Sequence, residues 1–235
     1  MAMSHNGVES WRTDPLYTIP EAAHLAHVST PTVKRWLFGY QTGASEMPPV
    51  FGEADRDDPM VSFLQLAEII VASAFRHRKI KLEVIRSAHA KAQLETRIEY
   101  PFAAVRFESI GGHILRLYDL ENGTNFVDVP PENSFEALDA PGNFTLPQIV
   151  METMHTFEYE HELAARWYPV ANTKLIVVDP RYSAGIPTIA GRRVSANSVI
   201  KRFRAGLSIS LIADDLLLTT EDVETIIRYA DEIAA

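Results

Sequence analysis

The sequence contains no cysteine, so it can form neither a disulfide framework nor a thiolate nucleophile. No apolar run approaches the roughly 20 residues that a membrane-spanning helix needs. The N-terminal residues lack the cationic segment followed by an apolar core that marks a signal peptide. Because a chain without cysteine suits a reducing compartment, we expect a cytoplasmic protein with no membrane partner.

Sequence patterns of enzymes are missing as well. There is no glycine-rich phosphate loop, no nucleophile elbow and no metal-ligand spacing such as HExxH. Glu158, Glu160, His161 and Glu162 cluster in a segment, residues 146–167, that is predicted to be one helix. Consecutive helical residues point to different sides, so we interpret these residues as a solvated acidic face. We therefore expect no catalytic residue, no cofactor and no metal.

Charge is distributed unevenly along the chain, whose net charge is −9 at pH 7. Residues 74–97 and 166–206 carry net charges of +5 and +7, whereas the segments around them are acidic. Because DNA binding depends on where cations cluster and not on the total, the acidic balance does not exclude it. A single basic segment is more often a solvated face, so these two mark candidate surfaces only.

Hydrophobic periodicity predicts a mainly α-helical fold with small β elements. We expect an N-terminal helix-turn-helix domain over residues 14–97, a connector over 98–171 and a C-terminal domain over 172–235. A short β-meander is predicted in the connector, from the alternation at 105–108, the Gly111-Gly112 turn and the apolar runs 114–118 and 125–129. A strand and a three-helix bundle are predicted in the C-terminal domain, with the strand at 175–178 and helices at 196–205, 208–216 and 220–234. Gly206 suits the end of the first helix, and Ser208 and Thr220 are placed to cap the other two.

Two short helices joined by a tight turn are predicted over residues 18–38. Ser29 is placed to cap the second helix, and Pro31 is tolerated in its first turn. Apolar residues recur at helical spacing, namely Ala22, Leu25, Ala26, Val33, Trp36 and Leu37. The second helix combines outward hydroxyls with cations, as a DNA recognition helix does, so we expect these residues to bind DNA: Ser29, Thr30, Thr32, Lys34 and Arg35.

This region resembles the helix-turn-helix of MerR-like and excisionase-like DNA-binding domains. The resemblance is carried by Pro-Glu-Ala-Ala at 20–23, Val-Ser at 28–29 and Thr-Val-Lys-Arg-Trp at 32–36. His27 replaces the glycine usual in the turn, and histidine tolerates a left-handed conformation better than most residues. The resemblance implies binding to double-stranded operator DNA. A helical hairpin that binds nothing is the alternative.

Residues 39–59 are rich in proline and glycine and are predicted to form turns and irregular structure. MerR-like domains carry their wing here. This segment contains acidic residues that phosphate would repel, so we do not expect it to follow the DNA backbone: Glu46, Glu53, Asp55, Asp57 and Asp58. Two helices are predicted next, one from Ser62 and one over 82–94. The basic turn 76–81 between them either contacts phosphate or solvates a helix end.

The C-terminal region carries a spaced pattern of glycine, proline, arginine and helix-capping residues. Its members are Gly185, Pro187, Ile189, Gly191, Arg193, Val194, Gly206, Ser208, Leu218, Thr219, Glu221, Asp222, Val223, Tyr229 and Ala230. This pattern resembles a small family of bacterial domains of formerly unknown function, whose members are known as VapB-like antitoxins encoded beside PIN-domain ribonucleases. The resemblance implies that the chain neutralises a PIN-type ribonuclease toxin and represses its own operon.

Arg192 and Arg193 lie between Gly191 and the next predicted helix. A PIN ribonuclease holds a divalent metal in a cluster of carboxylates, with which an arginine can pair bidentately. We expect both arginines to contact the toxin and favour Arg193, because it falls on the arginine of the family pattern. The alternatives are a solvated Arg192, and an Arg193 that bonds carbonyls of the 185–191 turn.

The C-terminal helices carry more apolar residues than a bundle of this size needs, which predicts a homodimer: Ile209, Ile212, Leu216, Leu217, Leu218 and Ile226. The last of these helices is acidic, so protein contact suits it better than DNA. The alternative to an antitoxin is a MerR-like transcriptional regulator whose middle sheet and C-terminal bundle sense a small molecule.

Overall fold

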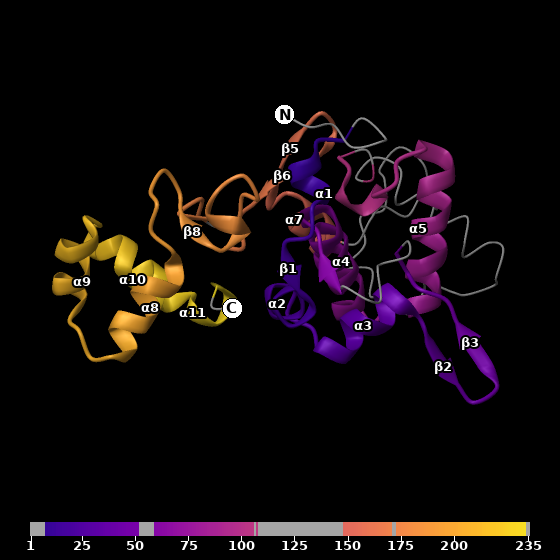
Figure 1. The fold of residues 1–235 in the computed structure, drawn as a ribbon, viewed down its shortest axis with the longest axis horizontal. Coiled ribbons are helices and arrows are strands. Elements are labelled where there is room, and N and C mark those ends of the chain that lie inside the picture. The colour runs from indigo at the N-terminus through magenta and orange to yellow at the C-terminus, as the bar shows by residue number, and fades with distance from the viewer. Residues whose placement is uncertain (1–7, 52–58, 106, 108–147, 171–172, 234–235) are drawn as a thin grey trace.

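The structure is a computed structural model that describes residues 8–51, 59–105, 107, 148–170 and 173–233. It contains two hydrophobic cores, one built from residues between Tyr17 and Val178 and a smaller one between Val170 and Ile233. Figure 1 shows the C-terminal helices, in yellow, standing apart from the N-terminal helices, with strand β8 (Thr188–Ile189) between them. The predicted fold class, mainly helical with small β elements, is confirmed.

The predicted helix-turn-helix is present near the N-terminus. It consists of α2 (Ile19–Leu25) and α3 (Thr30–Phe38), which follow a short helix, α1 (Ser10–Thr13), and a strand, β1 (Tyr17–Thr18). All six apolar positions expected to face inward are at most 2 % exposed. Ser29 caps α3 as predicted, because its hydroxyl accepts a hydrogen bond from the Thr32 N–H at 3.3 Å. His27, in the turn, has the expected left-handed conformation, with φ +54°.

A β-hairpin follows α3, where the sequence predicted irregular structure. It pairs β2 (Tyr40–Thr42) with β3 (Ser45–Met47). Gly39 makes the turn into it possible, because its φ is +70° and a Cβ there would lie 2.3 Å from the Met47 carbonyl oxygen. Glu46 lies on this hairpin. The other acidic residues of the expected wing, Glu53, Asp55, Asp57 and Asp58, fall outside the described residues.

The two helices predicted after this segment are confirmed as α4 (Phe63–His77) and α5 (Leu82–Thr96), preceded by β4 (Met60–Val61), which pairs with β1. Helix α4 is buried along almost its whole length, so it is the central helix of the larger core. Its Glu68 forms a buried hydrogen bond with the His89 of α5, with 2.8 Å between Oε1 and Nε2. No described helix is long and apolar enough to cross a membrane.

The middle region differs from the prediction. A 3₁₀ helix, η1 (Pro101–Ala103), comes before Val105, which lies in a turn, and Phe107, which is helical, so the predicted strand 105–108 is wrong at its described residues. Phe107 is buried and packs against Phe102 at 4.6 Å between ring centroids, whereas Val105 is exposed, so the apolar alternation does not mark one buried face. The rest of the predicted meander, 108–129, lies outside the described residues.

The helix predicted over residues 146–167 is confirmed only in its first part and is wrong from residue 157 onward. A short helix, α7 (Gln148–Met154), is followed by an antiparallel hairpin of β5 (Phe157–Glu160) and β6 (Leu163–Trp167). His161 and Glu162 make its turn with φ +51° and +69°. Aromatic residues favour strands, and Phe157 stacks on Trp167 across the pair at 6.1 Å between centroids.

The C-terminal part follows the prediction more closely. Strand β7 (Ile176–Val177) pairs with β8, and η4 (Ser183–Gly185) lies between them. The helices are α8 (Ala196–Arg204), α9 (Ile209–Leu216), α10 (Thr220–Arg228) and α11 (Ala230–Ile233). Ser208 caps α9 as predicted, but α10 is capped by Thr219 and not Thr220, because Thr219 is extended and forms a capping box with Asp222.

Candidate functional site

The outer surface of α3 is the first candidate site. Ser29, Lys34 and Arg35 are exposed, whereas Thr30 and Thr32 are partly buried. The Ser29 and Thr32 hydroxyls lie 2.8 Å apart and together organise the start of the helix. Lys34 and Arg35 are the two charged residues of the predicted set, and both are exposed to solvent.

Arg35 also connects α3 to the hairpin. Its guanidinium carbon lies 5.5 Å from the centroid of the Tyr40 ring on β2, which is the distance of a cation–π contact. Sequence reasoning missed Tyr40 because it treated the whole segment after α3 as irregular. The contact places a cation of α3 beside the hairpin, at the end of the larger unit where α3 and β2 meet in Figure 1.

The basic turn between α4 and α5 has a structural component. Arg76 donates a hydrogen bond to the Ile80 carbonyl at 2.6 Å, so its guanidinium closes the turn at the end of α4. Lys79 and Lys81 are exposed. A contact of these lysines with phosphate stays a prediction.

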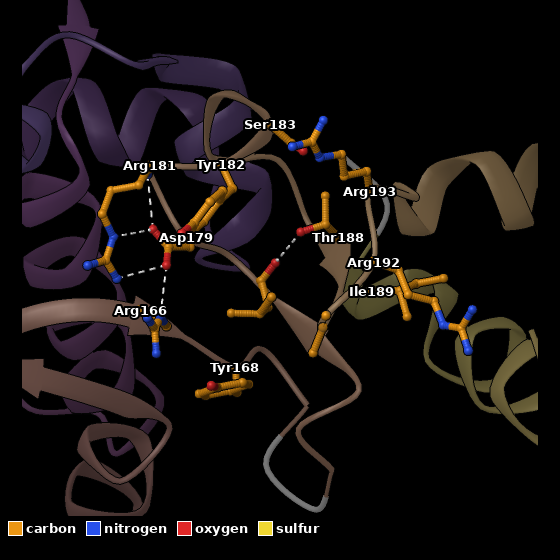
Figure 2. Close-up of a pocket in the computed structure, with 13 residues that line it drawn as sticks. Arg166, Tyr168, Asp179, Arg181, Tyr182, Ser183, Thr188, Ile189, Arg192 and Arg193 are labelled. Atoms are coloured by element: carbon orange, nitrogen blue, oxygen red, sulfur yellow. Dashed lines mark hydrogen bonds and ion pairs between the residues drawn. The ribbon is translucent and has the colours of Figure 1, made fainter.

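The second candidate site is a cavity of about 660 Å³ between β6, β7, β8 and the loop after β8. Figure 2 shows its arginines approaching from different segments: Arg166 from β6, Arg181 from the segment after β7, and Arg192 and Arg193 from the loop after β8. Sequence analysis predicted Arg192 and Arg193, and the structure places both on the lining of this cavity.

The floor of this cavity is a buried carboxylate held by two arginines. Asp179 is only 3 % exposed. It accepts a hydrogen bond from Arg166 Nε at 2.8 Å and from Arg181 Nε and Nη2, both at 2.9 Å. Although burial opposes ionisation, the hydrogen bonds from Arg181 and Arg166 hold the pKa of Asp179 below its ordinary value. The same bonds raise the pKa of Arg181.

Glu158 and Glu160 extend this network, which corrects their interpretation as a solvated helical face. The strand pairing shifts between Glu158 and Tyr159, but both glutamates reach Arg166, at 3.2 Å and 3.8 Å, so they lie on the same side of β5. Glu158 contacts Lys174 at 2.7 Å and Arg166 at 3.2 Å, and Glu160 contacts Arg181 at 3.0 Å. Hydrogen bonds from Lys174 and Arg166 lower the pKa of Glu158. The alternation of aromatic and acidic residues from 157 to 160 was the signal for a strand.

Arg192 and Arg193 have different environments. Arg192 donates a hydrogen bond to the Leu217 carbonyl, where α9 ends in a left-handed residue. Arg193 is exposed, and its guanidinium forms no hydrogen bond or ion pair with any residue that the structure describes. Figure 2 shows Arg193 directed toward Ser183, whereas Arg192 turns toward the C-terminal helices. Arg192 is thus exposed and also bound to the end of α9, and contact of either arginine with a toxin stays a prediction.

A further set of contacts joins the cavity to the helix-turn-helix. The Trp11 ring of α1 contacts two guanidiniums, since the Arg12 and Arg181 carbons both lie 4.6 Å from its centroid. Arg12, which is 1 % exposed, donates to the Glu160 carbonyl on β5 at 2.9 Å. No group of three or more described His, Asp or Glu side chains is arranged to hold a metal ion.

Comparison with known families agrees with this two-part organisation. Residues 15–89 match a family described as "Putative DNA-binding HTH domain", and residues 176–230 match one described as "Protein of unknown function (DUF433)". The chain thus combines an N-terminal region that matches a helix-turn-helix family with a C-terminal region that matches DUF433. Arg193, the arginine of the predicted C-terminal pattern, lies within the second match.

Two relatives from Mycobacterium tuberculosis match nearly the whole chain. "Putative antitoxin VapB45" is 24% identical over 94% of this chain and 95% of its own length. "Uncharacterized protein Rv2308" is 24% identical over 91% of this chain and 89% of its own length. The crystal structure of Rv2018 from the same organism has the same fold, with a TM-score of 0.71 at 22% identity over 91% of this chain and 97% of that one.

Proposed function

We propose that this chain is an antitoxin that binds operator DNA through α3 and neutralises a PIN-type ribonuclease, so that it represses its own operon. The observation that carries the proposal is the similarity, over 94% of the chain, to a protein named as an antitoxin. The helix-turn-helix match supports the DNA-binding half of this function.

The DNA interface consists of α3 and the cap before it. The exposed Lys34 and Arg35 contact phosphates, and the hydroxyls of Ser29, Thr30 and Thr32 approach base edges near the start of the helix. The hairpin beside α3 adds one carboxylate, Glu46, so it contributes little to phosphate binding.

The toxin interface includes Arg193. Residues 166–206 carry a net charge of +7, and a PIN active site is acidic, so the two surfaces attract over a distance. Arg193 can give its full set of donors to a carboxylate, because no described residue binds its guanidinium. Arg192 contributes charge while it remains bound to the end of α9.

The chain acts as a homodimer on an inverted repeat of operator DNA. Ile212 and Ile226 are used within the smaller core, but Leu211 and Leu217 are 53 % and 78 % exposed, which leaves apolar surface for a second copy. We also propose that residues 14–97 form the DNA-binding domain and residues 172–235 the toxin-binding domain, and that residues 98–171 connect them.

The test is co-expression of the chain with the PIN-type ribonuclease encoded beside it. We expect the two to co-purify, the ribonuclease to lose RNA cleavage in the complex, and the complex to shift a DNA fragment from upstream of the operon. Ribonuclease activity that is unchanged by an excess of folded chain would refute the antitoxin proposal. Binding to a small molecule that alters DNA affinity, with no ribonuclease partner, would instead indicate the ligand-sensing regulator.

A further inference from the structure

The polar groups at the floor of the cavity are paired with one another, whereas those at its mouth remain available to bind a ligand. In the floor, Asp179 pairs with Arg166 and Arg181, and the network is completed by Glu158, Glu160 and Lys174, so three carboxylates meet three cations. At the mouth, the Arg193 guanidinium is unmatched among the described residues, and the exposed Ser183 lies across from it (Figure 2). An incoming anion therefore meets its free donors at the mouth and not at the floor.

We infer that this cavity is a socket for a carboxylate side chain of a partner protein, which enters between Arg193 and the Tyr182–Ser183 segment. A carboxylate accepts two parallel hydrogen bonds from a guanidinium, and the Ser183 hydroxyl offers a further donor. The inference rests on the proposed function for the identity of the partner, a PIN-type ribonuclease. Its chemistry rests on the cavity alone.

The surroundings of the mouth favour a protein over a free small anion. Tyr182, which lines the cavity, is 64 % exposed, and Ile186 in the same loop is 46 % exposed. Leu217, whose carbonyl binds Arg192 of the lining, is 78 % exposed. Exposed tyrosine and apolar side chains around an unpaired arginine are typical of protein interfaces, where a partner surface covers the rim and excludes water.

The socket differs from the insertion of Arg193 into the partner. In a socket the partner's carboxylate occupies the cavity, so filling the cavity blocks binding even when Arg193 is intact. If Arg193 extends into the partner, only the arginine itself matters. Ala190 lines the cavity and is exposed, so Ala190→Phe fills it without removing a charge. Arg193→Gln removes the charge and leaves the cavity open.

The experiment measures the affinity of the full chain for the co-encoded PIN-type ribonuclease by isothermal titration. We expect Ala190→Phe and Arg193→Gln each to weaken binding by at least about tenfold, because each removes a charge-assisted contact. The control is Arg97→Gln, an exposed cation at the end of α5 that lies outside the lining and outside the basic segment 166–206, and it should leave affinity unchanged. Thermal melting checks that each variant is folded.

A second arm uses capped hexaglutamate and hexaglutamine peptides and free glutarate as probes. We expect hexaglutamate alone to bind, and to lose affinity in both cavity variants. Full ribonuclease affinity in folded Ala190→Phe, together with loss in Arg193→Gln, overturns the socket in favour of insertion. If glutarate binds as tightly as hexaglutamate, the cavity binds small free carboxylates, and the inference of a protein partner is wrong. If the ribonuclease does not bind the unaltered chain, the proposed function fails, while the peptides still decide whether a carboxylate enters.

Discussion

The Tyr17 hydroxyl donates a hydrogen bond to the Gly185 carbonyl at 3.1 Å, and this contact joins the helix-turn-helix to the arginine-lined cavity. Tyr17 is the residue before Thr18, which caps α2, and Gly185 is the last residue of η4 on the loop that carries Tyr182 and Ser183. Burial raises the pKa of the Tyr17 phenol, so the hydroxyl remains a hydrogen-bond donor throughout the physiological range.

We predict that Gly185→Ala destabilises the protein more than a matched glycine variant does. Gly185 has φ +67°, and an added Cβ would lie 2.3 Å from the Tyr17 hydroxyl oxygen. Gly191→Ala is the control, because Gly191 has φ +72° but no atom within 4 Å of that position. We expect backbone strain to lower the free energy of unfolding by about 1 kcal/mol in both variants. The clash should lower it by about 1–3 kcal/mol more in Gly185→Ala. Equal free energies of unfolding in urea titrations would contradict this.

Features that depend on neighbouring residues could be predicted from the sequence, whereas features that depend on residues far apart in the chain could not. The caps at Ser29 and Ser208 and the turn at His27 depend on neighbouring residues, and they could be predicted. The β5–β6 hairpin could not, because its turn uses His161 and Glu162 in place of the glycine or asparagine that usually marks such a turn. The cavity depends on arginines from separate segments that meet only in the folded chain, so Arg193 could be identified but not the network beneath it.

Replacing both Lys34 and Arg35 with alanine should weaken DNA binding and flatten its salt dependence. Each lost phosphate contact lowers the slope of log affinity against log salt by about 1, so the double variant should lose about 2. Fluorescence anisotropy at several salt concentrations measures this slope. Lys201→Ala is the control, because Lys201 is an exposed cation on α8 in the C-terminal bundle. An unchanged slope in the double variant would show that α3 does not contact DNA.

Removal of one member of the buried Glu68–His89 pair should be destabilising. Both side chains are at most 3 % exposed, and Glu68 Oε1 also accepts the Phe102 N–H at 3.3 Å. His89→Ala leaves the buried Glu68 carboxyl group without this hydrogen-bond partner, which typically costs about 1–3 kcal/mol. The double variant Glu68→Leu/His89→Leu should recover much of this loss, since an apolar pair of similar volume avoids the desolvation cost. Chemical denaturation of the unaltered chain, His89→Ala and the double variant measures their order of stability. A double variant less stable than His89→Ala would contradict the prediction.

The homodimer predicted from the C-terminal helices should depend on Leu211, which is 53 % exposed on α9. Leu211→Glu introduces a charge into the proposed contact, and we expect a monomer at micromolar concentration where the unaltered chain is a dimer. Leu94→Glu is the matched control, because Leu94 is 80 % exposed on α5. Light scattering during size-exclusion chromatography measures both masses. A monomeric unaltered chain would remove the dimer, and a dimeric Leu211→Glu would move the interface elsewhere.

Asp179 should make the protein less stable in acid. Its pKa is lowered in the folded state, so the unfolded state binds more protons as pH falls below the ordinary value of about 4. The stabilisation from Asp179 is therefore complete above that pH and is lost as pH falls through the lower folded pKa. Asp179→Asn should cost on the order of 2 kcal/mol at pH 7, since it weakens the charge-assisted bonds from Arg166 and Arg181. The difference from the unaltered chain should shrink as pH falls from about 5 to 2.

Urea titrations across this pH range give the free energy of unfolding of each protein. Asp214→Asn is the control, because Asp214 is an exposed carboxylate on α9 outside the arginine network. Its curve should follow that of the unaltered chain at neutral pH. If Asp179→Asn instead lowered stability by the same amount at every pH, its contribution would come from packing and not from the charge that Arg166 and Arg181 hold at the floor of the cavity.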